Sequence, residues 1–238
     1  SIAGIRKIAS NIMLEKFGGY VIAYNGTTVI NCKTGECVYN KTIPSDIIKP
    51  VYEAAKKENV CITVYNDKDK EMICGNGLNE YTEMDAKACD VSVREEKDFV
   101  KAVNFPINKI LLSGDPERMK EIENIMERQF GDRLNIFRSD PFYVELLPKF
   151  VDKGTAVEKL AKHLDIPKNK VICVGDSYND LPMLRFAGMG IAMGNAQSEV
   201  KEAADFVTLS NDEDGVACVI KKFMTPKPEE SEKVEDKE

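Results

Sequence analysis

The first hydrophobic positions of the chain repeat with helical spacing and then gather into short apolar runs. Apolar residues recur every three to four positions in the segment 2–17, which predicts a helix that stops at Gly18–Gly19. The compact run 20–24 predicts a buried strand, and the pair Asn25–Gly26 predicts a tight turn after it. The segment 28–39 then predicts a hairpin.

From residue 46 to residue 147 the pattern changes to helices that alternate with hairpins. Helical periodicity is found in the segments 46–58 and 116–130. Strand patterns occupy the segments 61–65, 71–74, 108–113, 134–138 and 142–147. This alternation is typical of an α+β module built on an antiparallel sheet.

After Pro148 helices and strands alternate strictly. The predicted helices cover 154–164, 181–187 and 215–223, with a short one near 197, and the predicted strands cover 171–174, 190–193 and 206–209. Strands that are apolar throughout indicate a parallel sheet covered on both faces, so the fold class is α/β. The domains predicted are a core in two parts, 1–28 and 148–223, and an inserted α+β module, 29–147. The Pro-rich acidic tail 224–238 is expected to be disordered.

Composition excludes several classes of protein. No apolar run approaches the ~20 residues of a membrane span, and no secretory signal is present, so a cytoplasmic protein is expected. The net charge of −7 without a Lys/Arg block argues against nucleic acid as a partner. The seven cysteines are scattered without a CxxC pair, and the single histidine is His163, which argues against a zinc site.

The segment Val171–Asp180, VICVGDSYND, places acidic side chains directly after a buried strand. Ligands of an open parallel sheet bind beyond the carboxyl ends of its strands, and Asp176 is the first side chain past Gly175. Asp180 follows in the same loop, and two carboxylates this close repel each other unless a cation lies between them. Hard oxygen ligands of this kind select Mg²⁺. Plain helix capping by Asp176 and Ser177 is the alternative, and the complete GDSYND string favours the metal.

Lys153 lies just before a predicted helix, one α/β unit upstream of Asp176. A cation at a helix N-terminus is unfavourable for the helix dipole, because the positive end of the dipole is already there. An anion bound between the lysine and the helix N-terminus removes that conflict. Lys153 is therefore predicted to bind phosphate, with an ordinary surface lysine as the alternative.

These residues resemble a known family. The segment 139–164 resembles the stretch with motif III of haloacid dehalogenase (HAD)-type phosphatases, VGDSYNDLPML resembles their motif IV, and GIAMGNAQSEVKEAADFVT resembles the stretch after it. The module 29–147 resembles the IIB cap of the Cof subgroup, especially its sugar-phosphatase members. The resemblance implies a HAD-like Rossmannoid parallel sheet with an inserted α+β cap.

The resemblance also implies roles for individual residues. Asp176 would be a Mg²⁺ ligand with Asp180 supporting its shell, Lys153 would neutralise phosphoryl oxygens, and Asn179 would donate to phosphate. Asn25 either faces the substrate or only forms its turn. The family reaction is hydrolysis of a phosphate monoester through a phosphoaspartate, which makes the expected partner a small phosphorylated metabolite, most simply a sugar phosphate.

One part of the family pattern is absent. Neither DxDGT, which carries the nucleophile, nor the Thr/Ser-Gly-Arg turn of motif II is found in these 238 residues. Asp67 and Asp69 have DxD spacing in a predicted turn, and Asp115 precedes a helix as a cap; none is followed by Gly-Thr. The expectation is therefore an N-terminally incomplete core that is inactive alone, with the nucleophile upstream. A non-catalytic phospholigand-binding relative and a phosphomutase are the alternatives.

Overall fold

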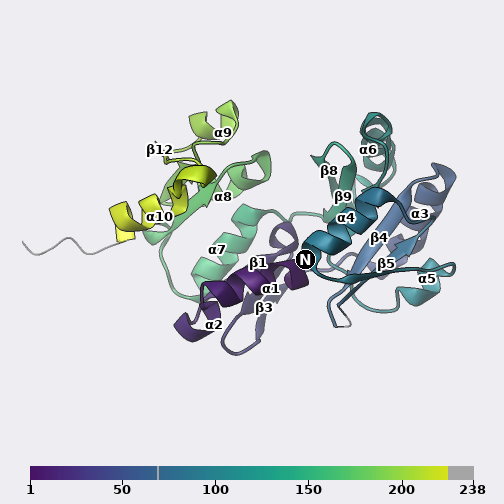
Figure 1. Ribbon diagram of the computed structural model, residues 1–238, viewed down its shortest axis with the longest axis horizontal. Coiled ribbons are helices and arrows are strands. Elements are labelled where there is room, and N and C mark those ends of the chain that lie inside the picture. The colour runs from purple at the N-terminus through teal and green to yellow at the C-terminus, as the bar shows by residue number, and fades with distance from the viewer. Residues whose placement is uncertain (69, 225–238) are drawn as a thin grey trace, which may run out of the picture. The chain divides into compact units, whose positions relative to one another are not determined.

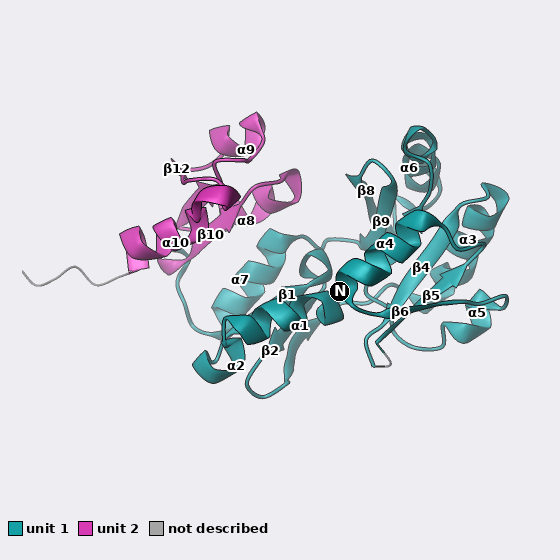
Figure 2. Ribbon diagram, in the orientation of Figure 1, with its two compact units in different colours: residues 1–168 teal, residues 169–238 magenta. Residues whose placement is uncertain are grey.

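The structure, a computed structural model, describes residues 1–68 and 70–224 and divides into two compact units at residue 168 (Figure 2). The predicted tail 224–238 lies outside the described residues except for Met224, and so does Asp69. None of the described helices combines the length and the apolar character that a membrane span needs.

The first unit begins with two helices and a small antiparallel sheet of order β1-β2-β3 (Figure 1). The elements are α1 (Ile2–Asn11), α2 (Leu14–Phe17), β1 (Tyr20–Ala23), β2 (Thr28–Asn31) and β3 (Cys37–Asn40). The helix predicted over 2–17 is broken at Met13, whose φ of 54° is left-handed. Because Ile8 and Ile12 are exposed, little packing holds the two halves in line. The domain boundary predicted at residue 28 falls at the start of β2, which pairs with β1.

The following part of the first unit forms a six-stranded sheet of order β6-β5-β4-β7-β9-β8. Its strands are β4 (Cys61–Asn66), β5 (Glu71–Gly75), β6 (Ser92–Glu95), β7 (Ile110–Ser113), β8 (Leu134–Asp140) and β9 (Tyr143–Pro148). All neighbours are antiparallel except β5 and β6. The antiparallel module predicted from the sequence is thus found, with one parallel edge strand added.

Helices cover both faces of this sheet. One face carries the main hydrophobic core, with Ile62, Ile110 and Leu146 packed beneath helices. Those helices are α3 (Ser45–Lys57), α5 (Phe99–Ala102) and α6 (Pro116–Phe130). The other face lies under α4 (Glu80–Cys89), where Tyr65 and Met72 are buried. We call this second side of the sheet the α4 face. The unit ends with α7 (Lys153–His163).

The second unit is a parallel sheet of order β10-β11-β12 with helices between its strands. The strands are β10 (Ile172–Gly175), β11 (Met189–Ala192) and β12 (Phe206–Val207), and the helices are α8 (Leu181–Phe186), α9 (Ser198–Glu202) and α10 (Gly215–Val219). Both pairings are parallel, as the alternating pattern predicted. The strands are apolar throughout, which is why the sequence located them within one or two residues.

Candidate functional site

The turn between β1 and β2 packs against the start of α7. Gly26 has a φ of +102°, and a Cβ atom there would lie 2.3 Å from the backbone oxygen of Asp152. Only glycine allows both the left-handed conformation and this close approach. The packing brings Asn25, next to Gly26, to the helix end that carries Lys153, although the two are far apart in the sequence.

Lys153 is the first residue of α7, one residue earlier than the helix start predicted from the sequence. Asp152 is the N-cap of that helix, and its carboxylate accepts a hydrogen bond of 2.7 Å from the backbone N–H of Thr155. The lysine is only half-buried. Its ammonium therefore adds positive charge to the end of the helix where backbone N–H groups already point outward.

Asn25 is fixed by a buried ion pair on the α4 face. Its Nδ2 donates to Oε2 of Glu145 at 2.8 Å, and Nζ of Lys109 lies 3.1 Å from Oε1 of the same carboxylate. The side chains of Lys109 and Glu145 are only 11% and 8% exposed. Each carboxylate oxygen thus has a donor, which is the condition for burying a charge at tolerable cost.

Tyrosines and further carboxylates surround this ion pair. The Lys109 ammonium lies 5.2 Å from the ring centre of Tyr65. The hydroxyl of Tyr24 donates to Asp67 at 2.7 Å, and burial together with the Asp67 charge raises the pKa of Tyr24. Burial and the nearby charge of Glu145 raise the pKa of Asp140, and the positive charge of Lys109 partly offsets this rise. Carboxylates and tyrosine rings thus lie around the Lys109 ammonium.

In the second unit, Asp180 organises the loop after β10. Its Oδ2 accepts hydrogen bonds from the backbone N–H groups of Asp176 at 2.9 Å and Ser177 at 3.1 Å. A Cβ atom on Gly175 would lie 2.5 Å from the Cβ of Asp180, so the strand can end here only as glycine. Asp180 is 3% exposed, and the contacts make it the support on which the loop is built.

Asp176 is the exposed carboxylate of that loop, at the carboxyl end of the strand. Within the described part of the chain, no side chain or backbone group donates a hydrogen bond to it, and Asn179 lies half-buried three residues on. No group of three or more His, Cys, Asp or Glu side chains suited to a metal is found in the described residues. One exposed carboxylate above a rigid turn fits Mg²⁺, which takes few protein ligands and keeps much of its water.

The structure brings the predicted residues together in two sets, one in each unit. Asn25 and Lys153 share one neighbourhood in the first unit, and Asp176, Asn179 and Asp180 share one loop in the second. Sequence reasoning missed Glu145 and Lys109. A signal for Glu145 was present, because it is the one charged residue in the buried strand β9.

Two of the acidic residues rejected as nucleophiles, Asp67 and Asp115, have structural partners. Asp115 caps α6 and accepts from the backbone N–H of Glu117 at 3.0 Å, as expected for a helix cap. Asp67 follows β4 and binds the Tyr24 hydroxyl.

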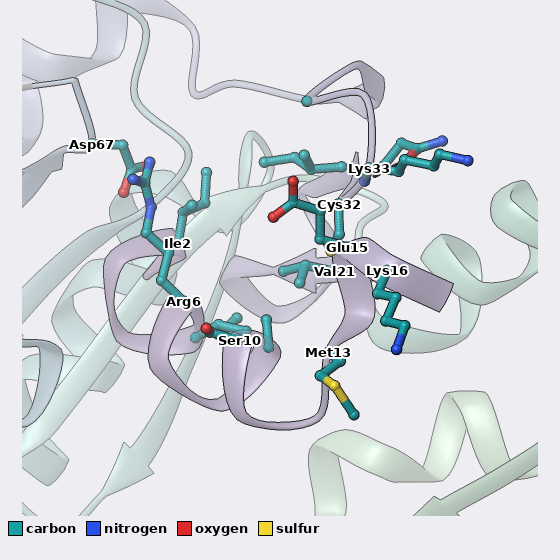
Figure 3. A pocket seen from close by; sticks show the side chains of 15 residues that line it. Ile2, Arg6, Ser10, Met13, Glu15, Lys16, Val21, Cys32, Lys33 and Asp67 are labelled. Carbon is teal, nitrogen blue, oxygen red and sulfur yellow. Dashed lines mark hydrogen bonds between the residues drawn. The ribbon is translucent and has the colours of Figure 1, made fainter. Parts of the chain in front are cut away.

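A cavity of about 830 Å³ lies in the first unit between α1, α2 and the first sheet. Figure 3 shows Arg6 and Asp67 near one end of it and Cys32 and Lys33 near the other. None of the five predicted site residues lines this cavity. Its lining includes Asp67, which also accepts the hydrogen bond from Tyr24.

Comparison with known proteins identifies the class. A sequence model of the haloacid dehalogenase-like hydrolases matches residues 1–220. The chain therefore belongs to this family, as the motifs after Ser139 indicated.

Individual relatives refine this assignment. YxeH of Bacillus subtilis, named as a phosphatase, is 31% identical over 226 residues, which is 95% of this chain and 83% of that protein. A haloacid dehalogenase-like hydrolase from Bacteroides thetaiotaomicron has 36% identity and a TM-score of 0.87, covering 93% of this chain and 82% of that one. The HAD subclass IIB sugar phosphatase BT4131 has 25% identity and a TM-score of 0.75 over the same shares of the two chains. The chain thus has the fold of HAD-like hydrolases with a cap.

Proposed function

We propose that this protein is a Mg²⁺-dependent phosphatase that hydrolyses small phosphate monoesters, with phosphorylated sugars as the substrate class. The observation that carries the proposal is the loop after β10. Asp176 is exposed at the carboxyl end of a parallel strand, and buried Asp180 holds the turn beneath it through two backbone hydrogen bonds. Relatives named as phosphatases, one of them a sugar phosphatase, support the choice of reaction.

The residues have separate tasks under this proposal. Asp176 would hold Mg²⁺, and Asp180 would support it by fixing the loop; when bound, the ion supplies positive charge for phosphoryl oxygens. Asn179 would donate to a phosphoryl oxygen. Lys153, at the start of α7, would neutralise the phosphoryl group together with the N–H groups of that helix.

Asn25 would contact the substrate beside Lys153. Glu145 already holds the Asn25 amide in place. Substrate binding therefore does not cost the conformational entropy of ordering a mobile side chain. A fixed amide is suited to recognising a hydroxyl or a phosphoryl oxygen at one place. The proposed substrate partner is a small phosphorylated metabolite.

The test measures inorganic phosphate released from a panel of sugar phosphates by the natural gene product, with and without Mg²⁺. Asp176→Asn and Lys153→Met should each lower kcat/KM by about 100-fold or more, because each removes charge that stabilises the transition state. Asp212→Asn and Lys162→Met are the matched controls, since both side chains are exposed and in the same units, and both should keep full activity.

Three results would overturn the proposal. An isomerised sugar phosphate without free phosphate would indicate a phosphomutase. Binding of phosphate or of Mg²⁺ without turnover of any substrate would indicate a binding protein. Equal losses in the control variants would show that Asp176 and Lys153 have no special part.

A further inference from the structure

The α4 face contains two cysteines whose sulfur atoms are close. Cys61 on β4 and Cys74 on β5 are both buried, and their Sγ atoms lie 3.1 Å apart. Cys74 is directly opposite Thr63, two residues beyond Cys61, so the two thiols are diagonal neighbours across an antiparallel pair. Both are reduced in the structure.

Two hydroxyl groups lie close to the Cys61 sulfur. Thr82 of α4 has its Oγ1 3.2 Å from this Sγ, and Thr63 has its Oγ1 3.8 Å away. Thr82 in turn shares a hydrogen bond of 3.0 Å with Ser113. The hydrogen bond with Cys74 and those with the hydroxyls lower the pKa of Cys61, and they outweigh the effect of burial.

This environment sets Cys61 apart from an ordinary buried thiol. Cys173 on β10 is buried to a similar degree, and burial raises its pKa to about 11. Thiols react with oxidants as thiolates, so hydrogen bonds that favour the thiolate make Cys61 more reactive than an equally buried thiol in apolar surroundings.

We propose that Cys61 and Cys74 form a redox modification site, in which hydrogen peroxide converts the pair into an intrachain disulfide that ties β4 to β5 and that a thiol reductant can reverse. The Cys61 thiolate attacks the peroxide oxygen, the O–O bond breaks, and a sulfenic acid and water result after protonation. The Cys74 thiol then attacks the sulfenic sulfur, the S–O bond breaks, and a second water leaves. The two thiols supply the two electrons that reduce the peroxide.

The consequence of the crosslink concerns α4. In the reduced protein the Cys61 sulfur is part of the hydrogen-bonded group that joins the sheet to Thr82 on this helix. A sulfur bonded to Cys74 has no proton to share and is drawn toward β5. The disulfide therefore adds a covalent link between β4 and β5 and weakens the contact between the sheet and Thr82 of α4. This site is independent of the phosphatase proposal, because none of its groups is among the proposed catalytic residues.

The experiment maps thiols in the folded chain. Cys32, Cys37 and Cys218, which are exposed or half-buried, are first replaced by serine so that only buried thiols remain. The protein is treated with hydrogen peroxide, the free thiols are alkylated, and the peptides are analysed by mass without reduction. We expect a Cys61–Cys74 linked peptide, lighter by about 2 Da than its two reduced parts, which dithiothreitol separates.

The controls are in the same molecule. Cys89 and Cys173 should be recovered alkylated after the same treatment. In a Cys74→Ser variant, dimedone should label Cys61 as a sulfenic acid and should leave Cys173 unlabelled. Recovery of both Cys61 and Cys74 as alkylated thiols, or linkage of either to Cys89 or Cys173 at an equal rate, would overturn the proposal, and neither readout requires a Cys61 variant that folds.

Discussion

At the scale of single residues, the decisive feature is a charge buried beneath α4. Glu145 lies in a strand whose six residues are all buried, and it is acceptable there because Lys109 and Asn25 occupy its two oxygens. Burying this ion pair costs the desolvation free energy of both charged groups, and in return it fixes a single geometry. Here the geometry gained is that of Asn25, the residue proposed to contact substrate.

Removing only one charge of the Lys109–Glu145 pair should lower the free energy of unfolding far more than removing both. Lys109→Met leaves Glu145 buried without its cation, and we expect a loss of about 3–5 kcal/mol in the free energy of unfolding. The double variant Lys109→Met/Glu145→Leu should lose markedly less, because no uncompensated charge remains. Urea unfolding followed by circular dichroism measures both.

An exposed ion pair serves as the control for these variants. Arg133 and Asp46 are 2.9 Å apart with side chains 43% and 68% exposed, and Arg133→Ala should cost less than about 1 kcal/mol. If the destabilisation of the double variant equalled the sum of those of Lys109→Met and Glu145→Leu alone, the pair would not be coupled as described.

At the scale of elements, the contact between the β1–β2 turn and α7 depends on a missing side chain. Gly26→Ala adds a Cβ in a left-handed conformation against the backbone of Asp152, where neither partner can yield easily. We expect a loss of more than about 1 kcal/mol in stability and a displaced Asn25. Gly35→Ala is the matched control.

Gly35 also has a positive φ, of +72°, but nothing lies within 4 Å of its added Cβ. Its substitution therefore reports backbone strain alone, and the difference between the two variants reports the packing on α7. Thermal unfolding of both variants gives this difference, and equal losses would show that the turn does not press on the helix.

The elements that could be predicted are those whose burial leaves a strong periodic pattern. α6 was located to the residue, because Met119, Ile122 and Met126 mark a continuous apolar stripe. α4 and β6 were missed, since α4 buries only Thr82, Ala86 and Cys89, which are small or polar, and β6 is an edge strand with mostly exposed residues. Small or polar buried side chains do not produce a clear periodic pattern of hydrophobic residues in the sequence.

The candidate site was predictable only in part for a related reason. Motif residues such as Asp176 and Lys153 follow a strand or begin a helix, so local sequence places them. Glu145 acquires its role from partners 36 and 120 residues away in the chain, and no local pattern records such contacts. The same holds for Cys61 and Cys74, which the sequence showed only as scattered thiols.

At the scale of the whole molecule, the chain consists of two compact units joined through a polar connection. Residues 162–170 are all exposed, and they link the end of α7 to the start of β10. This stretch includes Lys162, Lys168 and Lys170. Exposed connections with little buried backbone are where proteases cut folded proteins first.

Limited trypsin digestion of the folded chain should therefore cut between the two units before it cuts within the described residues of either of them. We expect early fragments that end or begin within residues 162–170, because β4 and β10 need local unfolding before a protease can bind them. Replacing Lys168 and Lys170 with glutamine should slow this cleavage, whereas replacing Lys49 and Lys56 on α3 should not. Mass analysis of the first fragments decides the question, and a first cut inside the six-stranded sheet or in β10–β11 would show that the division at residue 168 is not the weakest point of the fold.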